Sequence, residues 1–232
     1  MHFFIGVIEV YYDKEKKKDS MLSLNQRLFL VFVILFLSDL RPCAAEDKIL
    51  LPFKKAKNLK LERQAALIAR NALFNYLLYG KTVKPVIPAS SLLMRPAGVF
   101  VTIVKDGVVR GCMGTVEPHE DSCAEEISRS AVMAATIDPW HEPVSKDELE
   151  GLDYIISVIG EIRKINSPSE LNPHKLGLLI RDGQKSALLL PGEAKTPEWQ
   201  IFKCKQKAGI PQYKKVEMFV FETVTLGPVK LK

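Results

Sequence analysis

Residues 98–114 have the sequence GVFVTIVKDGVVRGCMG, which contains the clearest hairpin pattern of the chain. Its first half is rich in β-branched residues, which favour strands, and Asp106-Gly107 is a strong two-residue hairpin turn. Val108 and Val109 begin the returning strand. The stretch therefore predicts two antiparallel strands, with Arg110-Gly111-Cys112-Met113-Gly114 at the end of the second one.

Three amphipathic or capped segments predict helices around this hairpin. In the first, apolar residues recur every three or four positions and Gly80 follows the last of them. The second begins with a capping-box pattern, Ser122 to Glu125, and the third begins with Thr196-Pro197, a good N-cap followed by a residue that suits the first turn. The expected helices span residues 61–79, 122–137 and 196–208.

Further strands are expected between and after these helices. Residues 152–159 form an apolar, β-rich run, and a second hairpin turns about Asp182-Gly183. A last strand is expected over residues 216–224. Because the elements lack steady β-α-β alternation, the sequence predicts an α+β fold with a mainly antiparallel sheet covered by helices.

The N-terminal region has the pattern of a secretory signal. Residues 28–37 (LFLVFVILFL) are an unbroken apolar run that follows Arg27 and precedes the small residues Cys43, Ala44 and Ala45. A membrane span needs about 20 apolar residues, whereas a signal core needs about 7–15. We expect residues 1–45 to be an extension with a signal peptide, residues 46–232 to be the exported domain, periplasmic or extracellular, and no membrane span to remain. An uncleaved anchor is the alternative.

The charge pattern argues against nucleic acid as a partner. The net charge of +6 is spread along the chain. A nucleic-acid face usually combines clustered basic residues with aromatics. The nearest cluster lies on and after the third helix, where a solvated surface is the simpler interpretation: Lys203, Lys205, Lys207, Lys214 and Lys215.

The stretch Arg110 to Gly114 is the main candidate for chemistry. Two glycines allow the backbone to bend closely around Cys112, and the Arg110 guanidinium is a cation that can stabilise a thiolate and lower a cysteine pKa. Exposed amides at Gly111 and Gly114 are candidates to bind an anion. The alternative is a packing cysteine between glycines that serve a β-bulge, since cysteine is among the most buried residue types.

A nucleophilic cysteine needs a base or an orienting group. The candidates within the same region are Glu117, His119, Asp138 and His141, none of them at a diagnostic spacing. Cys123 and Cys204 are expected to serve packing or capping. The cysteines and histidines have no spacing typical of a metal site, and nucleotide-loop, zincin and hydrolase-elbow motifs are absent from the sequence, which leaves the cofactor unknown.

Several short segments occur in the same order as in the AMMECR domain family, and the chain resembles that family from Leu61 to Val224. They are GVFVT at 98–102, DG at 106–107, VRGCMGT at 109–115, DP at 138–139, ISVI at 156–159, GLLIR at 177–181, LLLP at 188–191 and KAGIP at 207–211. The family's central element is Arg-Gly-Cys-Ile-Gly, from which Met113 departs. Asp138-Pro139 is also followed here by Trp-His instead of the family's Arg-aromatic pair.

The resemblance implies a mainly antiparallel α+β fold, a smaller helical subdomain and a site around the Arg-Gly-Cys stretch, but no established reaction. It also implies partnership with Memo-type or radical S-adenosylmethionine proteins. Three functions stay open. The first is a thiol-dependent enzyme in which Cys112 attacks, Arg110 stabilises charge and Glu117, His119 or His141 moves protons; Asp138 would line the site. The second is a non-catalytic module for a small anionic ligand or a partner protein, and the third is RNA modification, which export disfavours.

Overall fold

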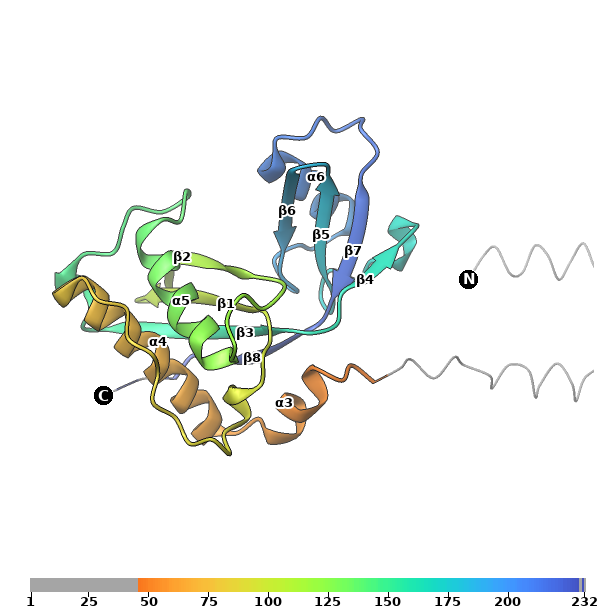
Figure 1. Cartoon of the computed structure of the whole chain (residues 1–232). Helices are drawn as coiled ribbons and strands as arrows, with labels where there is room; N and C mark the ends of the chain where they lie inside the picture. Colours follow the sequence, from red (N-terminus) through yellow and green to blue (C-terminus); the bar gives the residue numbers. More distant parts are fainter. Residues whose placement is uncertain (1–45, 230, 232) are drawn as a thin grey trace, which may run out of the picture. The chain divides into compact units, whose positions relative to one another are not determined.

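A computed structural model describes residues 46–229 and 231, and the predicted signal peptide lies outside this range. The described part of the chain has two four-stranded sheets and four α-helices (Figure 1). All strand pairs of these two sheets are antiparallel, and the combination of helices with antiparallel sheets confirms the predicted α+β class. No helix within these residues is long and apolar enough to cross a bilayer.

The first sheet contains the hairpin about Asp106-Gly107. Its order is β2-β1-β3-β8. Alternate side chains of the central strand β1 point into one core, where Val99, Val101 and Ile103 are fully buried. This period of two is the expected signature of a strand with one face on the core. The strands are β1 (Val99–Lys105), β2 (Val108–Thr115), β3 (Leu152–Ile159) and β8 (Thr223–Leu226).

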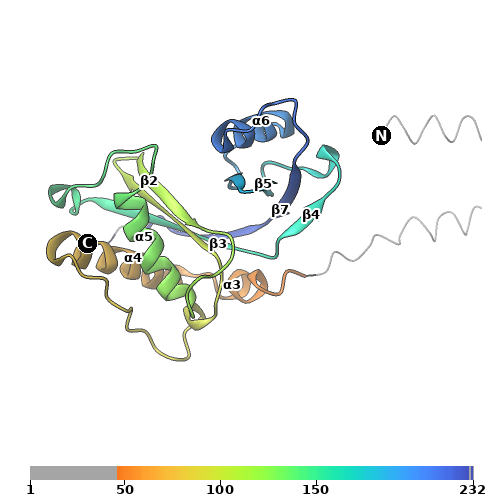
Figure 2. The ribbon, with the colours of Figure 1, turned by 45° about the horizontal axis from the view of Figure 1, so that its top comes forward.

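Two of the predicted helices pack on this sheet. Both α4 (Leu59–Tyr79) and α5 (Cys123–Thr136) contact the sheet and each other (Figure 2). The side chain of Asn58 caps the start of α4, and Gly80 ends it with a left-handed backbone. The Ser122 hydroxyl accepts the Glu125 amide at the start of α5. A short helix, α3 (Leu50–Ala56), precedes them and contacts β8.

The second sheet forms a separate lobe with its own core. Its order is β4-β7-β5-β6, and α6 (Pro197–Ala208) packs on β5 and β6. Thr196 caps α6, as predicted, and Gly209 ends the helix with a left-handed backbone. The strands are β4 (Arg163–Ile165), β5 (Gly177–Asp182), β6 (Lys185–Leu189) and β7 (Glu217–Phe221).

The sheet is therefore divided in two, where the sequence predicted one. The strand expected over residues 216–224 breaks at Glu222, where the chain leaves β7 in the second sheet and enters β8 in the first. The chain makes the opposite passage between β3 and β4, and the Gly160 amide donates to the Glu222 carbonyl at 3.0 Å. Three short 3₁₀ turns complete the chain: η1 (Leu92–Met94), η2 (Lys146–Glu148) and η3 (Pro168–Glu170).

Candidate functional site

The Arg-Gly-Cys-Met-Gly stretch lies inside β2, not at its end, and a β-bulge interrupts it. Val104 pairs with Val109 and Ile103 pairs with Gly111, so Arg110 has no partner on β1. A bulge of this kind re-aims the side chain of the extra residue. It also shifts the register by one, which brings Thr102 opposite Cys112.

Arg110 makes an ion pair away from the thiol. Its Nε and Nη2 atoms donate to Glu148 Oε2 at 2.8 Å and Oε1 at 2.9 Å, a bidentate geometry that links β2 to η2. This hydrogen bond, with help from the Ser145 amide, lowers the pKa of Glu148 to about 2. The structure therefore engages the guanidinium with a carboxylate and does not bring it to the Cys112 thiol, where the sequence predicted it.

Cys112 is half-buried, and its surroundings favour the neutral thiol. Burial raises the pKa of Cys112, and a hydrogen bond from Thr102 opposes this effect. The Thr102 hydroxyl donates to Sγ at 3.1 Å. The Cys112 amide donates in a different direction, to Asp138 Oδ2 at 2.7 Å. The cysteine is thus fixed at both its backbone and its side chain.

Asp138 joins Cys112 to a histidine. Its Oδ2 atom accepts the Cys112 amide and also contacts His141 Nδ1 at 3.0 Å, while Oδ1 accepts the Trp140 amide at 2.8 Å. Burial alone would raise the pKa of Asp138, but the hydrogen bonds from Cys112, Trp140 and His141 outweigh it, and the pKa is lowered. Asp138 is therefore an ionised, buried acceptor that orders the loop after α5.

Cys112, Asp138 and His141 line a cleft of about 750 Å³ between the two lobes. The first lobe contributes Cys112, Asp138 and His141, with Phe100, Val109 and Trp140. The second lobe contributes residues from the end of β6, the following loop and α6: Leu188, Leu189, Leu190, Glu193, Trp199, Lys203, Gln206 and Lys207. A volume of this size is typical of small-molecule sites.

The other predicted site residues do not line the cleft. Glu117 is exposed and lies 3.6 Å from Arg181 on β5. The amide of His119 donates to the buried carboxylate of Glu126 at 2.8 Å. Among the four predicted partners for Cys112, the structure brings Asp138 and His141 to the cysteine's cleft and leaves Glu117 and His119 outside it.

The two glycines of the motif are explained by close packing. A Cβ atom at Gly111 would overlap the carbonyl oxygen of Ala134 on α5, and one at Gly114 would overlap the carbonyl oxygen of Val99 on β1. Neither residue lines the cleft. The glycines let β2 approach its neighbours, and their predicted role in ligand binding has no contact to support it.

Sequence reasoning missed Thr102, which contacts the Cys112 thiol, and the residues that complete the cleft. Thr102 was hidden because only the bulge brings it opposite Cys112. Trp140, Trp199, Lys203 and Lys207 come from two distant segments, and their shared position depends on how the lobes meet. One pattern pointed to part of this set: Trp199, Lys203 and Lys207 are spaced by four residues, which puts them on one face of a helix.

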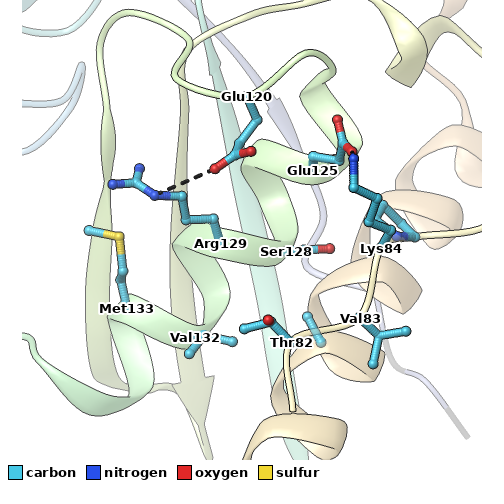
Figure 3. Close-up of a pocket in the computed structure, with 11 residues that line it drawn as sticks. Thr82, Val83, Lys84, Glu120, Glu125, Ser128, Arg129, Val132 and Met133 are labelled. Atoms are coloured by element: carbon cyan, nitrogen blue, oxygen red, sulfur yellow. Dashed lines mark ion pairs between the residues drawn. The ribbon is translucent and has the colours of Figure 1, made fainter.

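A second pocket, about 520 Å³, lies between α4, α5 and residues 82–85, and we call it the α4–α5 pocket (Figure 3). Its charged groups are paired with one another. Lys84 contacts Glu125 at 2.8 Å, and Arg129 contacts Glu120 at 3.7 Å and Glu126 at 3.3 Å. The pocket contains no cysteine or histidine, so it is the weaker candidate for chemistry.

The two other cysteines that the structure describes are buried in the two cores. Burial raises the pKa of Cys123 to about 12 and that of Cys204 to about 12. All three described cysteines are free. Within residues 46–229 and 231, no three metal-ligating side chains come together.

An α+β protein of two antiparallel sheets, with a cysteine, a histidine and a carboxylate in the cleft between them, is the class that this fold and site define. The chain belongs to the AMMECR1 family, whose model matches residues 66–226.

Relatives in bacteria and archaea support this assignment. A protein of Thermotoga maritima is 40% identical over 144 residues, which cover 60% of this chain and 82% of the relative. A Clostridium acetobutylicum protein is 37% identical over 63% of this chain, but the match covers only 32% of that longer relative. The crystal structure of the uncharacterized protein PH0010 from Pyrococcus horikoshii superimposes with a TM-score of 0.67 at 25% identity, and covers 72% of this chain and 91% of that one.

Proposed function

We propose that the cleft is the functional site and that Cys112 acts there as a nucleophile whose proton is taken by His141. One observation carries the proposal: Asp138 Oδ2 accepts the Cys112 amide at 2.7 Å and contacts His141 Nδ1 at 3.0 Å. A single carboxylate thus orients both the residue that would attack and the residue that would act as base. This is the arrangement by which a third group aligns a nucleophile–base pair.

The charge of Asp138 determines the histidine tautomer. Because the pKa of Asp138 is lowered, the carboxylate is ionised near neutral pH and can only accept hydrogen bonds. His141 Nδ1 therefore carries the proton and donates it to Asp138. In the neutral ring this leaves Nε2 free to accept a proton, as a general base requires.

In the proposed step, the proton on Sγ passes to His141 Nε2. The electron pair of the S–H bond forms a bond to an electrophilic carbonyl carbon of the substrate, and the π electrons of the carbonyl move onto its oxygen. The Thr102 hydroxyl, 3.1 Å from Sγ, stabilises the sulfur while it carries negative charge.

Alkylation kinetics test this role. We expect iodoacetamide to label Cys112 in the native protein, with Cys123 and Cys204 labelled only after unfolding because both are buried. His141→Gln should slow labelling of Cys112 near neutral pH about fivefold or more, since the base is removed. His119→Gln is the matched control, because His119 lies outside the cleft. Mass spectrometry of each peptide over a pH series gives the rates.

Equal rates of Cys112 alkylation in the two histidine variants would contradict the proposed role of Cys112 as a nucleophile. They would favour a second function, a non-catalytic module that binds a small anion. The observation behind that alternative is the raised pKa of Cys112, which keeps the thiol neutral at rest. In that case Cys112→Ser would leave ligand affinity unchanged.

RNA modification has less support from the surface charges. Of the five lysines considered for nucleic acid, Lys205 is buried and donates to the carbonyls of Gln212 and Lys214. The Lys214 ammonium contacts Asp182 at 2.7 Å. Two of the five cations are therefore engaged within the protein.

Export and partnership also belong to the proposal. Cell fractionation and N-terminal sequencing test export, and a start at Glu46 is the expected result. Partnership with a Memo-type or radical S-adenosylmethionine protein is proposed from the family resemblance. Co-expression with such a protein, followed by size-exclusion chromatography, tests the partnership.

A further inference from the structure

The α6 side of the cleft carries a stripe of one aromatic and two cationic side chains. Trp199, Lys203 and Lys207 follow one another at four-residue intervals and all line the cleft. Residues with this spacing share a helix face, and the stripe extends over about 12 Å of helix axis. The stripe therefore presents a ring and then positive charge along one wall.

The two lysines are not neutralised by carboxylates. The Lys203 ammonium donates to Gln206 Oε1 at 2.7 Å, and that of Lys207 to the Leu188 carbonyl at 3.3 Å. Within the described residues neither makes an ion pair, in contrast to Lys84 and Arg129 of the α4–α5 pocket (Figure 3). Glu193 also lines the cleft, but its Oε2 atom accepts the Leu190 amide at 2.7 Å.

Aromatic surface is left open on both walls. Trp140 is 67% exposed and Trp199 is 44% exposed, and both line the cleft. These are the only two tryptophans of the chain. An exposed indole in a concave site offers a flat face on which another ring can stack, and such stacking contributes about 1–3 kcal/mol for a base.

We propose that the cleft binds a nucleotide-like compound, in which a flat heteroaromatic ring stacks on tryptophan and a phosphate lies against Lys203 and Lys207. Leu188, Leu189 and Leu190 supply the apolar floor that such sites usually have. This inference rests on the proposed function in using the same cleft, and it names the ligand class.

Isothermal titration with AMP, adenosine and inorganic phosphate tests the ligand class on the whole protein. AMP should bind about tenfold or more tightly than either half alone, since the ring and the phosphate are recognised together. Binding of AMP should also quench the intrinsic fluorescence, because both tryptophans line the cleft. AMP that binds no more tightly than adenosine or phosphate, or that does not bind, overturns the inference.

Variants locate the site. Trp199→Leu should weaken the binding of AMP about tenfold and leave the binding of phosphate unaffected. Phe202 is an exposed aromatic residue of the same helix that lies outside the cleft, so Phe202→Leu should change neither affinity. Lys203→Gln should remove most of the advantage of AMP over adenosine, and Lys84→Gln in the α4–α5 pocket should not. Equal effects of Trp199→Leu and Phe202→Leu would overturn the placement.

AMP titration of the wild-type protein and the alkylation rates of the histidine variants together separate this inference from the proposed function. If AMP binds but His141→Gln does not slow alkylation of Cys112, the proposed ligand class holds and the proposed role of Cys112 as a nucleophile is wrong. If alkylation depends on His141 but AMP does not bind, the nucleophile stands and the ligand class fails.

Discussion

The two walls of the cleft are held in different ways. On the first-lobe wall, Asp138 accepts three hydrogen bonds, and next to Cys112 in β2 the glycine Gly111, which does not itself line the cleft, lies directly against α5. On the α6 wall, Trp199 is partly exposed and the Lys203 ammonium bonds to a neutral neighbour on its own helix. The difference separates a rigid wall, suited to chemistry, from an adaptable wall, suited to recognition. Substitutions on the first should cost stability, and substitutions on the second should cost binding.

The largest loss of stability is expected at Gly111. A Cβ atom there would overlap the Ala134 carbonyl, which is backbone and cannot rotate away. Gly111→Ala should therefore lower the free energy of unfolding by about 3 kcal/mol, as overpacking of a well-packed core does. Urea unfolding measures it, with Val108→Ala on the exposed part of β2 as control. If Gly111→Ala lowers the free energy of unfolding no more than Val108→Ala does, the packing of β2 against α5 is not tight and the first-lobe wall is not rigid.

Asp138→Asn should have the next largest effect. The amide nitrogen of Asn replaces one of the two carboxylate oxygens and cannot accept, so the side chain loses either the Trp140 hydrogen bond or those of Cys112 and His141. A buried donor left without its acceptor costs about 1–3 kcal/mol, so we expect a loss of about 2 kcal/mol. Asp106→Asn in the exposed hairpin turn should change stability by less than about 0.5 kcal/mol. Similar losses in the free energy of unfolding for Asp138→Asn and Asp106→Asn would mean that the hydrogen bonds of Asp138 do not stabilise the fold.

The Arg110–Glu148 pair should give a smaller effect that depends on pH. The pKa of Glu148 is lowered to about 2, mainly by the hydrogen bond to Arg110. A carboxyl whose pKa is lower in the folded protein stabilises the fold above its unfolded pKa, and this stability is lost as the pH falls toward about 2. Because the pair is partly exposed to solvent, we expect Glu148→Gln to cost about 1 kcal/mol near neutral pH and less at about pH 3.

Urea unfolding at both pH values measures this change. Glu217→Gln is the matched control, since Glu217 pairs with Lys164 on the exposed surface and should contribute little at either pH. A cost of Glu148→Gln that stays constant between the two pH values would exclude the pair as its source.

The smallest change in stability is expected on the α6 wall. Trp199→Leu and Lys203→Gln should each alter the free energy of unfolding by less than about 0.5 kcal/mol, because Trp199 is partly exposed and the Lys203 ammonium bonds to a neutral neighbour on its own helix. Thermal unfolding is sufficient to check this. A loss above about 1 kcal/mol would mean that this wall also supports the fold, and the contrast between the walls would disappear.

Local patterns in the sequence were enough for the helices and for most strands. The caps at Ser122 and Thr196 and the left-handed glycines at 80 and 209 act within one turn, so neighbouring residues determine them. Asp138 and His141 were found because they lie near Cys112 in the sequence. The division into two sheets was not found, because residues 216–224 have the composition of one continuous strand and the change of sheet at Glu222 is a tertiary event.

The candidate site was only half predictable, and the bulge at Arg110 is the main reason. A regular hairpin about Asp106-Gly107 would place Thr102 opposite Gly111, whereas the extra residue moves it opposite Cys112. The same bulge turns Arg110 toward Glu148, so adjacency to Cys112 in the sequence did not mean contact with its thiol. The α6 residues needed the packing of the lobes, which no local pattern encodes.

The passages between the sheets have a consequence for how this protein is divided. Every described element between β3 and β8 belongs to the second lobe, and the strands that flank this segment pair directly, Ile159 with Thr223. The second lobe is thus an insert into the first sheet, the host sheet. Its two ends leave and rejoin this sheet at neighbouring positions on β3 and β8. It can be exchanged or elaborated without altering the register of the host. The cleft then lies at the boundary between the host sheet and the insert. A different insert would therefore change which ligand the protein recognises, while Cys112 would stay in place.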